Sequence, residues 1–338
     1  GAILIGKDAG TALTTGGRNT AIGYEALTTA VDLTHNIAIG WQTMKDSSAT
    51  TSHRNIGIGS FVMDSVGSNV AADNVAIGYN NLTALTTGNN NTVIGSNAGI
   101  AITSASRNVA VGTNALKAFT VGSDVNLGNI AIGYGALDSL QTGMSNIAIG
   151  VAAMDAVVGA VSNCVVIGDR AADGALTTAA DGTVALGYHA LGALTSGGGN
   201  TAVGFEAGKA MTTGANLTAV GYQAGLLLPA GANSNTAIGS GALSVGNAST
   251  TDHNTCVGYL AGDDITDGQK NTIIGSESDP LSGGGSNQTA IGYGVAAVAD
   301  NSVTLGNDDV TRVNMAHDGA AVMYANGTIN TSDIRFKK

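Results

Sequence analysis

The sequence predicts an all-β fold, a parallel β-roll or β-solenoid of about 18 short coils, from three observations. One short signature recurs along the chain, the spacing of its copies is nearly constant, and apolar residues alternate within each copy. The composition agrees with such a fold, because Gly makes up 51 of 338 residues, Pro only 2, and charged residues 11%. Globular chains average about 25% charged residues and about 7% Gly. The chain is therefore expected to be repetitive and structural.

The recurring signature is an Asn, a β-branched residue, Ala, Ile and Gly, often followed by an aromatic residue; residues 19–24 read N-T-A-I-G-Y. We call the glycine of each copy the anchor glycine. Most anchor glycines follow one another at 17 to 19 residues, with one gap of 21 and a last gap of 14. Such a period indicates stacked units that bury their apolar faces only against neighbouring units. The anchors are Gly6, Gly23, Gly40, Gly59, Gly78, Gly95, Gly112, Gly133, Gly150, Gly168, Gly187, Gly204, Gly221, Gly239, Gly258, Gly275, Gly292 and Gly306.

The residues before each anchor glycine predict a short strand. The residue directly before the glycine is Ile, Val or Leu in every copy, and the residue two positions earlier is Ile, Val, Leu or Thr. Strand side chains alternate between faces, so these two positions share a face, which we expect to line the inside of the coil. The residue between them is Ala in eleven copies and is expected to point outward. A Tyr-x-Ala-Leu segment after the glycine predicts a second short strand, and a Thr- and Gly-rich stretch leads back to the next Asn.

Two columns of the repeat predict structural roles. Asn stands four residues before the anchor glycine in twelve copies. Stacked at about 4.8 Å, these side chains would form an amide ladder. The anchor glycine is expected to sit where the backbone turns sharply, with a positive φ or no room for a Cβ atom. Representative positions are Asn19, Asn36, Asn74, Asn146 and Asn235 in the first column and Gly23, Gly40, Gly78, Gly150 and Gly239 in the second.

The Ala column leads to a prediction about assembly. An outward ribbon of small apolar residues along the whole solenoid would be a large exposed patch for a monomer. Identical chains could cover it around a threefold axis. The sequence therefore predicts a parallel homotrimer with the Ala column at or near its axis and the charged return loops facing outward. The interface residues expected on this basis are Ala38, Ala131, Ala148, Ala202 and Ala219.

Several functional classes are disfavoured by the sequence. The formal net charge is −11 and Lys and Arg form no cluster, so nucleic acid is not an expected partner. No apolar run approaches about 18 residues, so no membrane insertion is expected. The five His show no metal-ligand spacing, no carboxylate pair suggests a glycan-cleaving enzyme, and no cofactor is expected. Cys164 and Cys256 lie five coils apart, too far for a disulfide.

Two surface patterns have alternative interpretations. An aromatic residue follows the anchor glycine in nine copies, beginning with Tyr24 and Trp41. Such a row is expected to pack at the coil corner or between subunits, and sugar binding is the alternative. Thr pairs such as Thr14–Thr15 lie in return stretches of varying length, so they are not expected to form the regular array that ice binding needs.

The coils over residues 2–307 resemble the head repeats of YadA-like trimeric autotransporter adhesins, which share the Asn, small apolar, Ala, Ile, Gly core. Those heads have a shorter coil, of about the length of the last gap here. Long arrays of the Asn-Thr-Ala-Ile-Gly-Tyr-x-Ala-Leu type are more similar to tail-fibre proteins. The resemblance implies a trimeric β-solenoid.

The C-terminal residues 331–338, T-S-D-I-R-F-K-K, resemble the opening of the endosialidase-type intramolecular chaperone domain. In that family the domain trimerises the fibre and then cuts itself off near this Ser-Asp. The resemblance implies a self-cleavage junction at Ser332 with Asp333, and Lys337 or Lys338 as a proton acceptor. It also implies three parts, a solenoid at 1–307, a neck at 308–331 and the chaperone start at 332–338. A helix N-terminus capped by Ser332 is a compatible interpretation.

The function expected from these patterns is a structural, non-enzymatic segment of a trimeric phage tail fibre or related appendage, located in a virion or at a cell surface. Its expected partner is itself, and a host-surface glycan or protein is a candidate receptor. The alternative is a bacterial surface adhesin of the trimeric autotransporter type. A chaperone domain after Lys338 would favour the fibre, whereas a coiled-coil stalk and membrane barrel would favour the adhesin.

Overall fold

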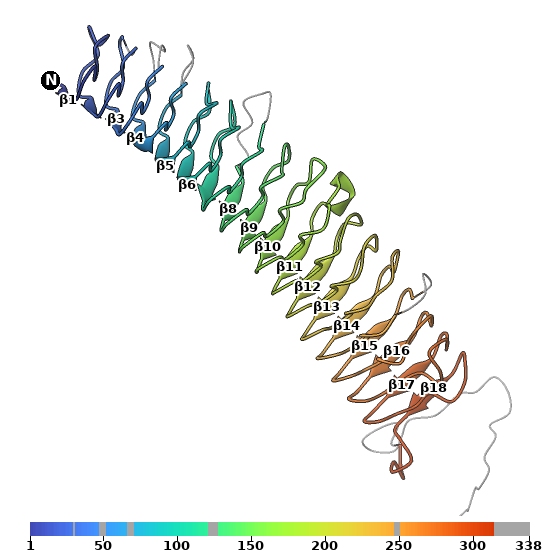
Figure 1. Cartoon of the computed structure of the whole chain (residues 1–338). Coiled ribbons are helices and arrows are strands. Elements are labelled where there is room, and N and C mark those ends of the chain that lie inside the picture. Colours follow the sequence, from blue (N-terminus) through green and yellow to red (C-terminus); the bar gives the residue numbers. More distant parts are fainter. Residues whose placement is uncertain (30, 47–51, 66–70, 121–127, 247–250, 314–338) are drawn as a thin grey trace, which may run out of the picture.

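The chain forms one long β-solenoid, seen in a computed structural model whose coils advance steadily from the N-terminus (Figure 1). The structure describes residues 1–338 except 30, 47–51, 66–70, 121–127, 247–250 and 314–338. Eighteen parallel strands build a single sheet, with one short 3-10 helix in a return loop. The predicted fold class, an all-β parallel solenoid, is confirmed.

Most strands are three residues long and end directly before an anchor glycine, while β4, β5 and β6 continue one residue past it. The strands are β1 (Ile3–Ile5), β2 (Thr20–Ile22), β3 (Ile37–Ile39), β4 (Ile56–Ser60), β5 (Val75–Tyr79), β6 (Thr92–Ser96), β7 (Val109–Val111), β8 (Ile130–Ile132), β9 (Ile147–Ile149), β10 (Val165–Ile167), β11 (Val184–Leu186), β12 (Thr201–Val203), β13 (Thr218–Val220), β14 (Thr236–Ile238), β15 (Thr255–Val257), β16 (Thr272–Ile274), β17 (Thr289–Ile291) and β18 (Val303–Leu305), and the 3-10 helix η1 spans Thr178–Ala180.

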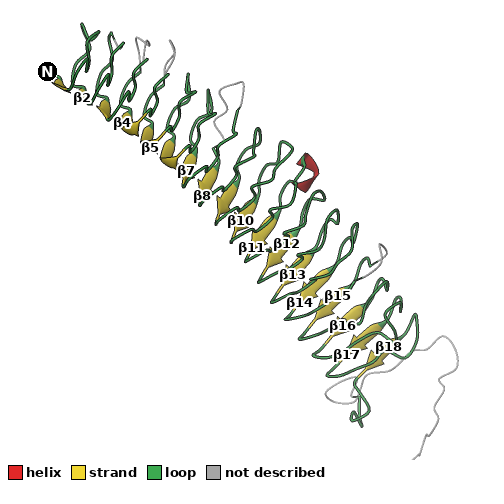
Figure 2. Ribbon diagram, viewed as in Figure 1, coloured by secondary structure: helices red, strands yellow, loops and turns green. Residues whose placement is uncertain are grey.

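Every strand pairs in parallel with the next strand along the sequence, so a single chain coils on itself. Equivalent positions stay in register along the stack: Ile22 pairs with Ile39, and Ile39 with Ile58. The expected second strand after the anchor glycine is not present in the described residues, where this segment runs as turns (Figure 2). Residues such as Glu25 and Leu27 there have positive φ, which breaks the extended backbone that a strand needs.

The prediction about which strand face lies inside was wrong. The Ala column is completely buried inside the coil, and the bulky positions on either side of it point outward and are partly exposed. Alternation showed correctly which residues share a face but not which face is the core. The expected interface residues therefore cannot contact another chain, since each is 0% exposed within its own coil: Ala38, Ala131, Ala148, Ala202 and Ala219.

The inverted orientation follows from what fills the coil. The segment after each anchor glycine turns two side chains inward, and in the coil of Gly23 these are Ala26 and Leu27, both 0% exposed. A Leu or Met from this side occupies most of the narrow interior. In most coils the facing strand then has room for little more than a methyl group, which Ala supplies, and only a few coils bury a larger residue there, such as Val93, Val166 or Ile273. Close packing of interiors explains why bulky Ile and Val are placed outside.

The anchor glycines are required for two independent reasons. Gly78 has a φ of +137°, a conformation essentially restricted to glycine. A Cβ atom at Gly78 would also overlap the carbonyl oxygen of Gly95, the anchor of the following coil. The same φ range recurs at the other representative anchors, Gly23, Gly40, Gly150 and Gly239.

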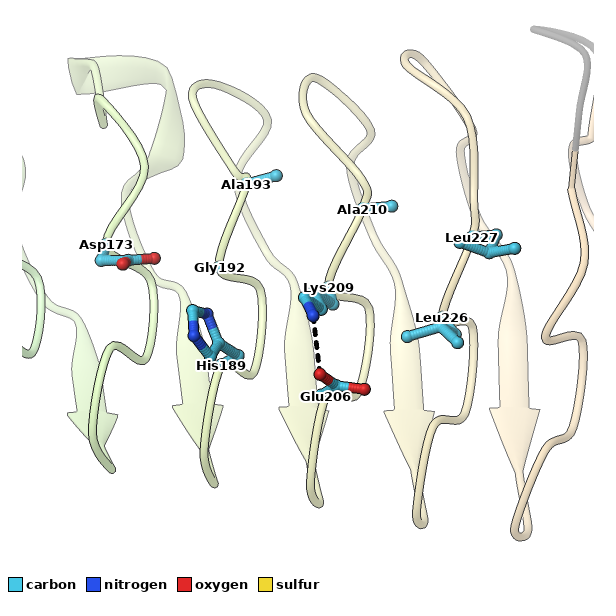
Figure 3. A pocket seen from close by; sticks show the side chains of 9 residues that line it. All are labelled: Asp173, His189, Gly192, Ala193, Glu206, Lys209, Ala210, Leu226 and Leu227. Carbon is cyan, nitrogen blue, oxygen red and sulfur yellow. Dashed lines mark hydrogen bonds and ion pairs between the residues drawn. The ribbon is translucent and has the colours of Figure 1, made fainter.

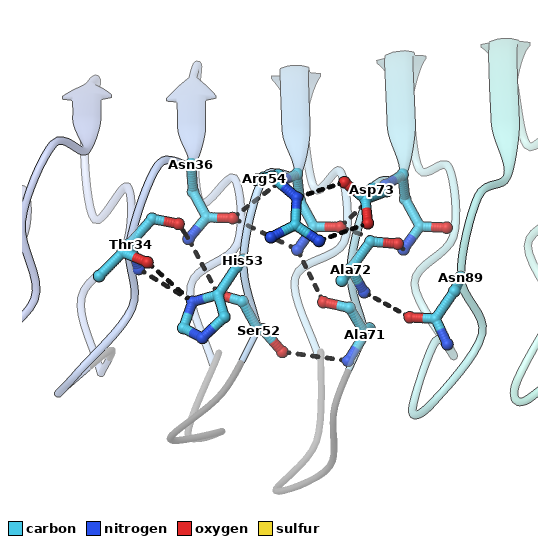
Figure 4. A network of polar contacts seen from close by, with 11 residues as sticks. Thr34, Asn36, Ser52, His53, Arg54, Ala71, Ala72, Asp73 and Asn89 are labelled. Atoms are coloured by element: carbon cyan, nitrogen blue, oxygen red, sulfur yellow. Dashed lines mark hydrogen bonds and ion pairs between the residues drawn. The ribbon is translucent and has the colours of Figure 1, made fainter.

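The Asn column forms a buried amide ladder of the kind that the repeat predicts. The side-chain oxygen of Asn36 accepts the backbone N–H of Asn55 at 2.8 Å, and that of Asn55 accepts the backbone N–H of Asn74 at 3.1 Å (Figure 4). Each amide nitrogen donates in turn to a carbonyl of a return loop, as Asn55 does to Ala71 at 2.9 Å. Asn19, Asn146 and Asn235 make equivalent bonds in other coils. The ladder thus ties strand, return loop and neighbouring coil together.

Both cysteines are buried and unpaired, as the stacking register predicts. Cys164 takes an Asn-ladder position, where its backbone N–H still donates to the Asn146 side chain at 3.1 Å. Cys256 takes an Ala-column position, paired in register with Ala237. Each therefore acts as a small core residue.

Candidate functional site

One surface cavity is a groove of about 390 Å³ that crosses neighbouring coils (Figure 3). Its side chains come from turns and return segments that lie in front of the strands in this view. None of them belongs to the β-sheet. The lining residues are Asp173, His189, Gly192, Ala193, Glu206, Lys209, Ala210, Leu226 and Leu227.

The groove is hollow because a glycine interrupts a row of larger side chains. The fifth residue after the anchor glycine is Asp173, Gly192, Lys209 and Leu226 in four successive coils. A Cβ atom at Gly192 would lie 3.0 Å from Nδ1 of His189 and 3.3 Å from Oδ1 of Asp173. Gly192 does not have a positive φ, so its backbone does not itself require glycine. A side chain at position 192 would therefore crowd both polar groups, which line the groove.

One part of the groove is held by a fixed polar cluster. The Glu206 carboxylate accepts from Lys209 Nζ at 2.6 Å and from Gln223 Nε2 at 2.9 Å. These partners, Lys209 first, lower the pKa of Glu206 below its usual value. Asp173 differs, because burial raises its pKa and its carboxylate accepts only from its own backbone N–H among the described residues. The groove therefore contains one satisfied carboxylate and one that is available.

A ladder of aromatic rings flanks the groove. Tyr188 and Phe205 stack with ring centroids 5.1 Å apart and planes 17° from parallel, and Phe205 and Tyr222 stack at 5.4 Å and 9°. His189 meets Tyr188 edge-on at 4.4 Å, which joins the ladder to the groove. The inner faces of the stack are covered by neighbouring rings. The row therefore packs between coils, which agrees with the packing role that the sequence indicates for it. The ring edges face the solvent.

The outer sheet face is a second candidate surface. Its two rows are the positions directly before, and three before, each anchor glycine, and they contain only Ile, Val, Leu and Thr. Ile94, Ile167 and Ile238 in the first row are 37–39% exposed. Parallel pairing keeps both rows in register from β1 to β18. This uncharged, flat face is available to a partner.

The remaining sequence candidates have structural roles or cannot be placed. Thr pairs hold return loops together, since Thr29 and Thr86 each donate to a carbonyl of the next coil. His53 contacts Thr34, within the network of Figure 4. No cluster of three or more His, Cys, Asp or Glu among the described residues is arranged to hold a metal ion. Ser332, Asp333 and Lys337 lie outside the described residues.

Sequence reasoning missed the groove. In the sequence Asp173 and Lys209 resemble the other charges of the return loops, and Gly192 resembles the other loop glycines. An alignment of the coils could have revealed it, because Gly192 is flanked by Asp173 and Lys209 in the adjacent coils.

No model of a known protein family matches this chain. A search of curated proteins also finds no match. In the part of the chain that the structure describes, no helix is sufficiently long and apolar for a transmembrane segment.

Proposed function

We propose that this chain is a segment of a trimeric fibre, in a phage tail fibre or a related appendage, whose work is reach, rigidity and attachment to a host surface. The observation that carries the proposal is the outer sheet face. It is uncharged and continuous over all 18 strands, with aliphatic residues throughout one row and aliphatic residues or Thr in the other, and its register is the same in every coil. In a sheet with one face in water, the water-facing positions of each strand normally carry polar residues.

The trimer uses the outward Ile and Val rows, in place of the Ala column that the sequence suggested. Identical chains carry identical rows, so three copies in parallel cover one another along their full length. A row of half-exposed aliphatic side chains leaves each chain with a large apolar patch when it is alone. Covering this patch provides the driving force for assembly.

The trimer is tested by solution mass and by charges placed on the sheet face. We expect light scattering to give three times the chain mass of 33.1 kDa. A triple variant, Ile132→Asp, Ile149→Asp and Ile167→Asp, places three stacked charges in one row and should give monomers. The matched control carries three charges at exposed loop positions, Val31→Asp, Val158→Asp and Val298→Asp.

The circular dichroism of both triple variants should match that of the unmodified chain, because the altered side chains lie outside the coil. A monomeric mass for the unmodified chain, or a trimer that survives the sheet-face charges, would contradict the proposal.

The second candidate is a bacterial adhesin of the trimeric autotransporter type, favoured by the head-like signature of the coils. The full-length gene product separates the two. The fibre proposal includes a chaperone domain that follows Lys338 and is cut off at Ser332. Ser332→Ala in the full-length protein should then leave the chaperone attached, as judged by the mass of the mature chain. Processing identical to that of the unmodified protein would argue against a junction at Ser332.

A further inference from the structure

We propose that the groove around Gly192 is a binding site for a neutral hexopyranose residue, which Asp173 and His189 hold through two adjacent hydroxyl groups. The inference deepens the attachment part of the proposed function by giving the receptor a chemical class. It depends on a single chain, since all nine lining residues come from neighbouring coils of one solenoid.

The polar groups of the groove are arranged for a pair of hydroxyls. Nδ1 of His189 and Oδ1 of Asp173 both approach the position that a Cβ atom on Gly192 would take, at 3.0 and 3.3 Å. A carboxylate accepts from a hydroxyl, and an imidazole accepts from or donates to a second one. Vicinal hydroxyls of a pyranose present this combination on neighbouring carbons. A ligand seated over Gly192 would therefore meet both groups at once.

The two polar groups are available, whereas their neighbours are already engaged. Glu206 is bonded to both Lys209 and Gln223. Neither the Asp173 carboxylate nor the His189 ring makes a side-chain hydrogen bond to another described residue. The edge-on contact with Tyr188 helps to orient the His189 ring. The Asp173 carboxylate accepts only from its own backbone N–H, and a carboxylate has about four acceptor sites, so a ligand can gain hydrogen bonds here.

The opposite side of the groove is apolar. Ala193, Ala210, Leu226 and Leu227 line it, and Leu227 is 46% exposed. A pyranose has one such face, formed by its C–H groups, beside its ring of hydroxyls. Mostly apolar walls with a few convergent polar groups are typical of small-molecule sites, as are volumes of about 300–1,000 Å³. The groove, at about 390 Å³, fits this description.

The charges select a neutral sugar over an acidic one. Lys209 is already paired with Glu206, and the opposing influences of His189 and Arg170 leave the pKa of Asp173 raised overall. Burial already raises the pKa of Asp173, which shows that its negative charge is poorly solvated. A second carboxylate brought by a ligand would be repelled. The aromatic ladder is not the sugar platform, because its inner ring faces are covered.

The test uses saturation-transfer NMR on the intact chain with the methyl glycosides of glucose, galactose and mannose. At least one should receive saturation from the protein. Gly192→Ala should abolish the signal, because the added methyl group fills the floor of the groove at a backbone conformation that Ala tolerates. Gly17→Ala is the matched control, since Gly17 has neither a positive φ nor any atom near its Cβ position, and it should bind as the unmodified chain does.

Two further variants test the polar contacts by titration. Asp173→Asn and His189→Asn should each weaken binding about tenfold, the size expected for losing one charge-assisted or well-oriented hydrogen bond. Asn is chosen at 189 because the residue has a φ of 51°, which Asn tolerates.

Three results would overturn the proposal: no transfer to any of the three glycosides, equal transfer in Gly192→Ala and Gly17→Ala, or binding of N-acetylneuraminate alone. The solution mass separates this failure from failure of the fibre proposal. A trimer without sugar binding refutes only the sugar site, and a monomer that binds sugar refutes only the trimer.

Discussion

Asn74→Ala is the sharpest test of the amide ladder. Asn74 is 0% exposed, and its side-chain oxygen accepts both the backbone N–H and the side-chain amide of Asn91 at 3.0 Å. Its amide nitrogen donates to the carbonyl of Gly88 at 2.9 Å and to Asn55 at 3.1 Å. Alanine removes all of these bonds. Two main-chain groups, the Asn91 N–H and the Gly88 carbonyl, then lose these partners inside the coil.

The expected cost follows from those two groups. A buried main-chain group without a partner costs about 1–3 kcal/mol, so the variant should lose about 2–6 kcal/mol of local stability. The side-chain amide of Asn91 keeps its bond to Ala105 at 2.9 Å and adds little. Solenoid coils contact only their neighbours, so coils far from Asn74, such as that of Asn235, should be unaffected.

Hydrogen exchange measured by mass spectrometry reads this effect coil by coil. The backbone amide of Asn91 should lose protection by at least about tenfold, since 1.4 kcal/mol corresponds to a factor of ten. The control is Asn97→Gly. It removes one partly buried amide pair with Asn80, at a φ of 55° that glycine adopts freely, and should cost less than about 1 kcal/mol. Equal exchange at Asn91 in the two variants would refute the ladder as a source of stability.

Three further predictions concern other columns. Gly78→Ala should open the solenoid locally, because its Cβ would overlap the Gly95 carbonyl at a φ of +137°, whereas Gly17→Ala should leave the melting curve unchanged. Cys164 and Cys256 should resist a thiol reagent until the chain is unfolded, since both are buried and burial raises the pKa of each thiol; rapid labelling of the native chain would contradict this. Burial also raises the pKa of Asp279 to about 6. Because the unfolded carboxyl has a pKa of about 3.9, charging it opposes folding from about pH 4 to 6. Denaturation should therefore show that the free energy of unfolding of Asp279→Asn rises relative to that of the unmodified chain across that interval. A difference between the two free energies that does not change with pH would count against the buried carboxylate.

The sequence was sufficient to predict the fold, because the repeat period, the strand and the turn at the anchor glycine each recur at equivalent positions of the aligned copies. The anchor glycines follow from a steric need that recurs along the stack, and the Asn ladder follows from a hydrogen-bonding need that Asn meets in twelve copies. The orientation of the strand was not predictable from alternation alone. Ala38 lies inside and its neighbours Ile37 and Ile39 outside because Met44 already fills the coil from the other side. Which face of the strand points inward therefore depends on the width of the coil interior. No single position of the repeat determines that width.

The groove could not be predicted for a related reason. It exists because one glycine, Gly192, falls beside His189 of its own coil and beside Asp173, which takes the same repeat position in the preceding coil. The repeat pattern shows the residues that the coils share, whereas this site arises where one coil differs from the others. Only the three-dimensional stacking brings those two polar groups to the same space.

The turns of the solenoid have a consequence for how the chain reaches its fold. Among the described residues, 38 non-glycine residues have positive φ, including bulky ones such as Leu27, Met44 and Phe61. Each such conformation costs about 1–2 kcal/mol relative to the right-handed region, so a single coil in isolation should not hold its shape. A completed coil presents backbone hydrogen-bonding groups and an apolar core surface to the next coil. The contacts made there offset this cost. We therefore expect folding to begin at a nucleus of a few coils and to spread outward one coil at a time. Each newly folded coil then serves as the template for the next.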